Sequence, residues 1–119
     1  MGAFLMRRLF LPALLALAAC ATAPTATEQP ATDLEKDKAS EQLMRCHLSA
    51  VKSLDDRKSD AMTIGVIAAG LCVREATAVV ETLSRGESDA RKRALRDRLQ
   101  EINSRAAAAV VLHLRSASQ

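Results

Sequence analysis

The chain has 119 residues, enough for one domain, and its 17 basic and 14 acidic residues give a formal net charge of +3. Two of the basic residues, Arg7 and Arg8, and both phenylalanines lie in the first ten residues, which leaves a nearly neutral remainder without Phe, Tyr or Trp. This composition argues against nucleic-acid binding, and it predicts a small aliphatic core that needs an additional covalent constraint.

The first 19 residues have the pattern of a signal peptide. A short basic segment, residues 1–8, ends in two arginines, and an apolar segment of 11 residues follows at positions 9–19. A helix of this length spans about half of the roughly 30 Å hydrocarbon core of a membrane, and Pro12 interrupts it. We therefore expect residues 1–19 to direct export rather than to form a membrane span.

The leader ends in Leu17-Ala18-Ala19-Cys20, which resembles the lipobox of bacterial lipoproteins. The resemblance covers residues 1–20 only. It implies that diacylglycerol is attached to the thiol of Cys20, that the peptide is cleaved before this residue, and that the new amino terminus is acylated. Two or more acyl chains anchor a protein stably, whereas one chain holds it only marginally. We expect this covalent lipid and no other cofactor.

The residue after Cys20 bears on the destination of the protein. It is Ala21 rather than aspartate, which resembles the pattern of Gram-negative lipoproteins that are sorted to the outer membrane. The pattern thus predicts an anchor in the outer membrane, with the protein on the periplasmic face. The alternative is an ordinary secretory leader cleaved after Ala23, but it would put Pro24 at the first mature position, which signal cleavage tolerates poorly.

A polar segment follows the lipidation motif. Residues 21–38 contain two prolines and four threonines, and Leu34 is their only large apolar residue. Because such a segment cannot bury a core, we expect residues 20–38 to form the lipidated cysteine and a flexible, disordered tether. The helical domain then covers residues 39–119.

Three helical segments are predicted in this domain, and no segment alternates like a strand. The first, about 40–56, carries an apolar stripe at spacings of three and four, with Ser40 as its cap. The second, about 61–85, is apolar almost all round between residues 61 and 73, which predicts the most buried helix. The third covers about 88–115. These patterns predict an all-α fold, a small antiparallel three-helix bundle.

Cys46 and Cys72 remain once Cys20 is assigned to lipid. If the first two helices form an antiparallel hairpin that turns near residues 58–59, both cysteines lie at nearly the same height, because each residue of a helix rises by about 1.5 Å. Both also lie on apolar faces, which predicts a disulfide rather than two buried free thiols. In an oxidising compartment it would close a loop of about 27 residues and contribute roughly 3.5 kcal/mol.

The chain offers little for catalysis or metal binding. Cys46 and Cys72 could join His47 and His113 as zinc ligands, but adjacent residues on a helix point about 100° apart and His113 belongs to another helix. A disulfide also removes the thiolate that a nucleophilic cysteine requires. We expect surface or partly buried histidines, no metal, no catalytic residue, and a protein that is not an enzyme.

The start of the third helix is basic. This stretch is a candidate contact patch for phosphates of lipid or lipopolysaccharide, formed by Arg91, Lys92, Arg93, Arg96 and Arg98. The simpler interpretation is the solvated face of a helix, where acidic neighbours balance these cations.

We expect a non-enzymatic envelope lipoprotein, an interaction or structural module held at the membrane by its acyl chains. Its expected partner is another envelope protein, no nucleic acid is expected, and a homodimer stays open. The alternatives are a chaperone that is similar in architecture to the pilot lipoproteins of secretins, and an exclusion or inhibitor lipoprotein. The segment GVIAAGLCVREA at 65–76 also resembles small exported helical proteins of proteobacteria.

Overall fold

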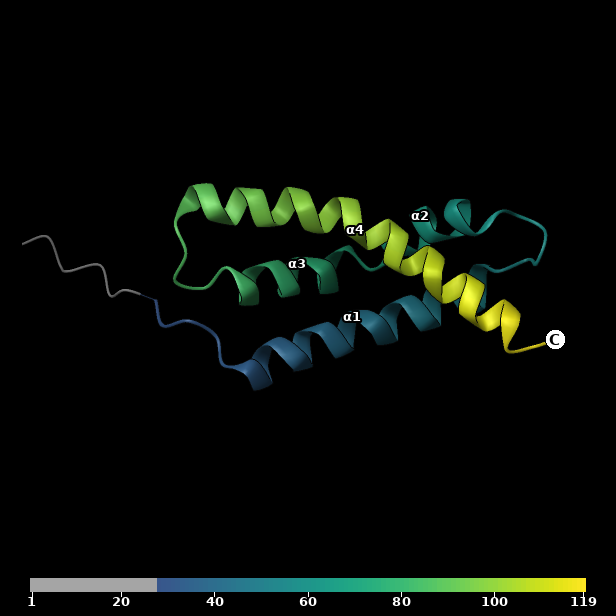
Figure 1. Ribbon diagram of the computed structural model, residues 1–119, viewed down its shortest axis with the longest axis horizontal. Helices are drawn as coiled ribbons and strands as arrows, with labels where there is room; N and C mark the ends of the chain where they lie inside the picture. Colours follow the sequence, from purple (N-terminus) through teal and green to yellow (C-terminus); the bar gives the residue numbers. More distant parts are fainter. Residues whose placement is uncertain (1–27) are drawn as a thin grey trace, which may run out of the picture.

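The computed structural model describes residues 28–119 and shows four α-helices and no strand in that range. The helices are α1 (Asp33–Leu54), α2 (Ala61–Leu71), α3 (Val73–Leu83) and α4 (Asp89–Ser116). α3 lies between α1 and the first half of α4, and α2 packs against the second half of α4 (Figure 1). The all-helical prediction is confirmed, but the prediction of three helices is wrong. The predicted signal peptide and Cys20 lie outside the described residues.

α1 begins earlier than predicted. Its cap is Thr32 rather than Ser40: the Thr32 hydroxyl accepts a hydrogen bond from the Glu35 amide (3.3 Å), and the Glu35 carboxylate accepts one from the Thr32 amide (2.7 Å). This reciprocal capping box satisfies two amides that would otherwise lack partners. The predicted tether therefore extends too far, because residues 33–38 are helical.

The predicted helix 61–85 is broken at Cys72, and the two parts, α2 and α3, are bent by 71° relative to each other. The backbone of Cys72 leaves the helical region (φ −101°, ψ 20°), and its amide donates to the carbonyls of Ala68 and Ala69. The bend has a tertiary reason: α2 packs mainly against α4, whereas α3 packs mainly against α1. A single straight helix would not reach both partners in this way.

The core is made of small side chains. The largest fully buried ones are His47, Val51, Val111 and Cys72. α2 and α4 approach closely at Gly65, where a Cβ atom would lie only 2.6 Å from the Ala108 amide nitrogen. A glycine is thus required there by the contact between two backbones, as in other tight helix crossings.

Ion pairs connect the ends of the helices. Arg115 near the end of α4 donates to both carboxylate oxygens of Asp55 (shortest distance 2.6 Å) and to the Ser59 carbonyl (2.8 Å). At the other end of the domain, Arg85 after α3 donates to Glu35 at the start of α1 (2.7 Å). Both contacts join segments that are 50 or more residues apart in sequence.

The link between α3 and α4 turns at Gly86, which adopts a positive φ of 81°. A Cβ atom there would lie 2.7 Å from the Glu28 carbonyl oxygen, so glycine suits both the backbone conformation and the close contact. α4 then begins at Ser88, whose hydroxyl accepts a hydrogen bond from the Arg91 amide. This start agrees with the predicted third segment.

Candidate functional site

The predicted disulfide is present. Cys46 of α1 is bonded to Cys72, the residue at the break between α2 and α3, with a Cα–Cα distance of 5.9 Å. Cys72 is fully buried and Cys46 is half-buried. The bond therefore fixes the corner of the α2–α3 bend to the middle of α1.

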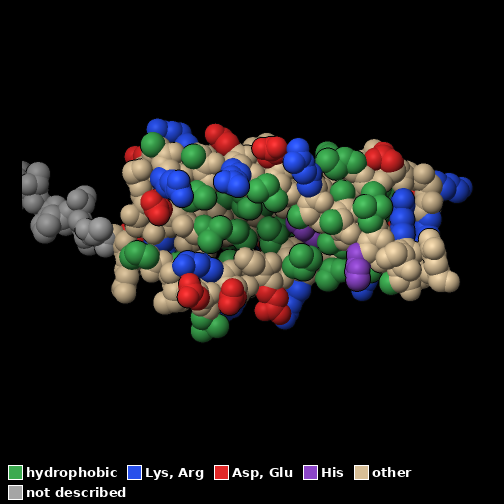
Figure 2. All heavy atoms as spheres, in the orientation of Figure 1, with side chains coloured by type: hydrophobic (Ala, Val, Ile, Leu, Met, Phe, Trp, Pro, Cys, Tyr) green, Lys and Arg blue, Asp and Glu red, His purple; other side chains and the backbone are tan. Residues whose placement is uncertain are grey.

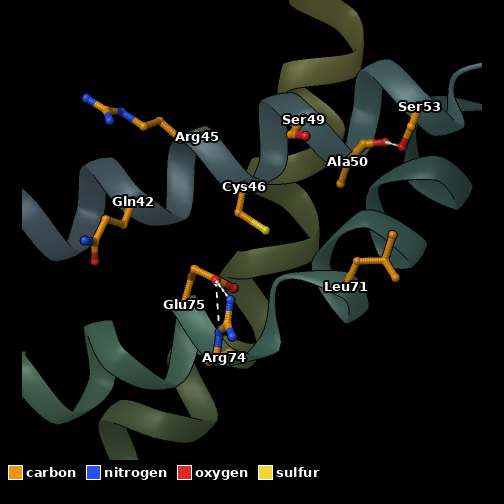
Figure 3. A pocket seen from close by; sticks show the side chains of 9 residues that line it. All are labelled: Gln42, Arg45, Cys46, Ser49, Ala50, Ser53, Leu71, Arg74 and Glu75. Carbon is orange, nitrogen blue, oxygen red and sulfur yellow. Dashed lines mark hydrogen bonds and ion pairs between the residues drawn. The ribbon is translucent and has the colours of Figure 1, made fainter.

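An open depression of about 810 Å³ lies beside this disulfide, between α1 and the α2–α3 corner (Figure 3). Its polar side chains do not converge on one point. Arg74 is paired with its neighbour Glu75 (3.0 Å), the Ser53 hydroxyl donates to the Ala50 carbonyl of its own helix, and Arg45 points away from the depression. This arrangement does not define a site for a small ligand.

A second hollow, a groove of about 510 Å³, runs between the bent α2–α3 pair and α4. Figure 2 shows that hydrophobic side chains also gather along the middle of the face turned to the viewer, between charged side chains at its upper and lower edges. The α4 wall consists of Arg96, Leu99, Gln100 and Ser104. The opposite wall is mostly apolar and consists of Val66, Ala69, Gly70, Val73, Ala76, Thr77, Val80 and Glu81.

The outer face of α2 continues this apolar surface. Residues 61–73 carry no charge, yet only one face of α2 is buried. Four of the 11 residues of α2 are buried, the largest share among the four helices, as expected for the segment predicted to be most buried. Its other face is open, because α4 and α1 cover α2 from one side only. The large apolar side chains on the uncovered side are between 44% and 63% exposed: Met62, Val66, Ile67, Leu71 and Val73. A continuous apolar surface of this kind is typical of a binding site.

Gly70 lies in the wall of the groove and differs from Gly65 of the same helix. A Cβ atom at Gly70 would meet nothing within 4 Å. Packing within the described domain therefore gives no reason for a glycine there, although a glycine inside a helix costs about 1 kcal/mol relative to alanine. The missing side chain leaves a notch in the groove wall.

The predicted basic patch lies in the first turns of α4. Of its five cations only Arg96 lines the groove, and Lys92 lies 3.8 Å from Glu28. Among residues 28–119 the nearby acidic residue Glu101 pairs with Arg105 (3.3 Å) rather than with a member of the patch. Glu81 stands on the wall opposite Arg96, and neither forms an ion pair among residues 28–119.

His47 is the largest buried polar group, whereas the sequence predicted a surface or partly buried histidine. Burial lowers the pKa of His47 below 6.5, and the neighbouring Asn103 side chain opposes this shift. Within residues 28–119, His47 Nε2 and Asn103 Oδ1 have no hydrogen-bond partner. His113 is exposed on α4. Among residues 28–119 no three His, Cys, Asp or Glu side chains are placed to hold a metal ion together.

Within residues 28–119 no single helix is long and apolar enough to cross a membrane; α2 and α3 reach that length and composition only as a bent pair. Comparison of the chain with family models, with curated proteins and with solved structures gives no match.

Proposed function

We propose that this chain is a lipid-anchored protein of the bacterial envelope that acts as a non-enzymatic binding module. The observation that carries the proposal is the largely apolar surface formed by the groove and the outer face of α2. A small domain with few large apolar side chains exposes this surface at a cost in solubility. Its exposure is explained if another molecule covers it.

The location of the protein rests on two further observations. The motif Leu17-Ala18-Ala19-Cys20 favours attachment of lipid to Cys20, and Ala21 favours the outer membrane. The Cys46–Cys72 disulfide fits this location, because disulfides persist in the periplasm and are rare in the cytosol. Both the lipid anchor and the disulfide are expected of an exported protein.

The groove also favours one of the alternative functions. A chaperone that is similar in architecture to the secretin pilots would hold a segment of its client, and a groove between helices is suited to this task. We therefore place a chaperone of this kind second, after a general binding module.

The anchor is tested by metabolic labelling of cells with radioactive palmitate. We expect the wild-type chain to be labelled and to sediment with the outer membrane. The Cys20→Ser variant should carry no label and should leave the membrane fraction. Labelling of this variant would contradict the proposed anchor.

The binding surface is tested by placing a photo-crosslinking amino acid at Val73 or at Leu112 in living cells. The two side chains are similarly exposed, at 63% and 59%, but only Val73 lines the groove. We expect a crosslinked protein adduct from Val73 and none from Leu112. No adduct at either site, or equal adducts at both, would contradict a binding function of the groove.

A further inference from the structure

The geometry points to an amphipathic α-helix of a partner protein as the occupant of the groove, with acidic residues along the flank that meets α4 and basic residues along the flank that meets α3. This inference rests on the proposed binding function and makes the class of partner specific. The shape of the groove, the open space at Gly70 and the charges of the two walls support it.

The shape of the groove selects a helix. Its walls are helices, whose backbone groups are already hydrogen-bonded, so they offer no strand edge to an extended peptide. An extended peptide would leave its own amides and carbonyls without partners against an apolar surface, whereas a helix satisfies them internally. The α4 wall from Arg96 to Ser104 is about 12 Å long, which corresponds to roughly two turns of a docked helix.

The notch at Gly70 indicates where the backbone of a docked helix would come closest to α2. Helices normally pack with their axes 8–10 Å apart, and small residues at the crossing allow a closer approach. Gly70 has open space where its Cβ would be, and it is flanked by Val66 and Val73, which are 53% and 63% exposed. A docked helix would bury both valines and bring its backbone close to Gly70.

The charges on the two walls of the groove determine which charges the docked helix should carry on its flanks. Arg96 and Glu81 stand on opposite walls, and neither is paired within the described domain. A helix with opposite charges along its two flanks neutralises both walls at once. The α2 helix of a second copy would not do so, because residues 61–73 are uncharged. An anionic membrane surface would meet Glu81 with repulsion.

The test uses the chain purified from the cell envelope and held in nanodiscs of neutral phosphatidylcholine. The probe is a fluorescent amphipathic helical peptide with an Ala/Leu face, Glu along one flank and Lys along the other. A second peptide carries Gln at all flank positions. We expect the charged peptide to bind at least tenfold more tightly than the Gln peptide.

Three variants locate the contact. Arg96→Glu makes both walls acidic, so we expect at least tenfold weaker binding of the charged peptide. The combination of Arg96→Glu with Glu81→Arg restores opposite walls and should return the affinity to within about threefold of the wild type, because the peptide can dock in the reverse direction. Arg91→Glu is the matched control: it makes the same change in net charge outside the groove and should have no effect.

A fourth variant tests the notch. Gly70→Leu fills it and should weaken binding at least tenfold, while the thermal midpoint of the protein stays the same or rises. Equal binding of both peptides, or equal losses for Arg96→Glu and Arg91→Glu, would overturn the inference.

Two other outcomes would overturn the inference in favour of another occupant. One is binding to phosphatidylglycerol nanodiscs that depends on Arg96 without peptide binding; the other is a dimer in sedimentation that Gly70→Leu dissociates. If Val73 still gives a specific adduct in cells but the peptide does not bind, the proposed binding function stands and only this inference fails.

Discussion

Gly65 of α2 lies directly against Ala108 of α4, so close that a Cβ atom on the glycine would be 2.6 Å from the alanine amide nitrogen and 2.8 Å from its Cβ. Five residues along the same helix, Gly70 faces open space. One helix thus contains two glycines of opposite character. Packing between α2 and α4 explains Gly65, whereas Gly70 lies in the open wall of the groove and is explained by the proposed binding partner.

This contrast predicts opposite effects of the same substitution. Gly65→Ala should destabilise the domain by roughly 1–3 kcal/mol, because it forces two backbones apart in a packed contact. Gly70→Ala should be neutral or should stabilise by up to about 1 kcal/mol, because alanine favours the helix and meets no neighbour. Urea denaturation of both variants measures the difference. Similar losses of stability would contradict the distinction.

Removal of the disulfide should cost a large part of the stability. The bond joins residues 26 apart in sequence, and a loop of this size corresponds to about 3.5 kcal/mol in the chain-entropy account. We expect this loss in the double variant Cys46→Ala/Cys72→Ala, measured by urea denaturation. Dithiothreitol should lower the stability of the wild type by a similar amount and leave the double variant unchanged. A wild type that is insensitive to reduction would contradict this prediction.

The ion pair between Glu35 and Arg85 should make stability depend on pH in the acidic range. The hydrogen bond from Arg85, helped by those from Thr32, lowers the pKa of Glu35 from 4.5 to about 2. The folded state therefore holds the proton less tightly than the unfolded state. The contribution of this carboxylate is complete above pH 4.5 and is lost as the pH falls towards 2.

The variant Glu35→Gln keeps a capping side chain but removes the charge that faces Arg85. At pH 7 we expect a lower urea midpoint than in the wild type, and this difference should disappear as the pH approaches 2. Glu41→Gln is the matched control, because Glu41 pairs with Arg45 on the exposed surface of the same helix. Equal effects of the two variants at pH 7 would count against a special role of the Glu35 contact.

The buried His47 should make stability depend on pH in the same direction, but in a higher pH range than Glu35. Burial lowers its pKa below 6.5, so the unfolded state takes up a proton more readily than the folded state. Stability should fall as the pH drops below 6.5, by at most about 1.4 kcal/mol per pH unit for one proton. His113→Gln leaves His47 as the only histidine of the chain and allows its titration to be followed by NMR. A midpoint at or above 6.5 would contradict the prediction.

Several elements of the fold are readable in the sequence because they depend on local geometry. The register of Cys46 and Cys72 follows from the constant rise of a helix. The cap at Ser88 and the turn at Gly86 follow from their residue types. Thr32 and Glu35 also form a recognisable capping pair, which the polar composition of the surrounding segment obscured.

The break at Cys72 and the groove could not be predicted from the sequence, because they depend on tertiary packing. No proline or glycine at position 72 marks the bend, which arises because α2 and α3 pack against different helices. The apolar composition of residues 61–73 predicts burial, but it does not show how many sides neighbouring helices cover. The groove depends on the angle between α3 and α4, and no sequence period encodes this angle.

The position of Cys72 links the binding surface to oxidation. The same residue ends α2, precedes α3 and is bonded to α1, so the covalent clamp sits at the corner from which the groove opens. A newly made chain with reduced thiols lacks this clamp. We therefore expect reduction of the Cys46–Cys72 bond to weaken binding in the groove, because it releases the corner of the α2–α3 bend from α1.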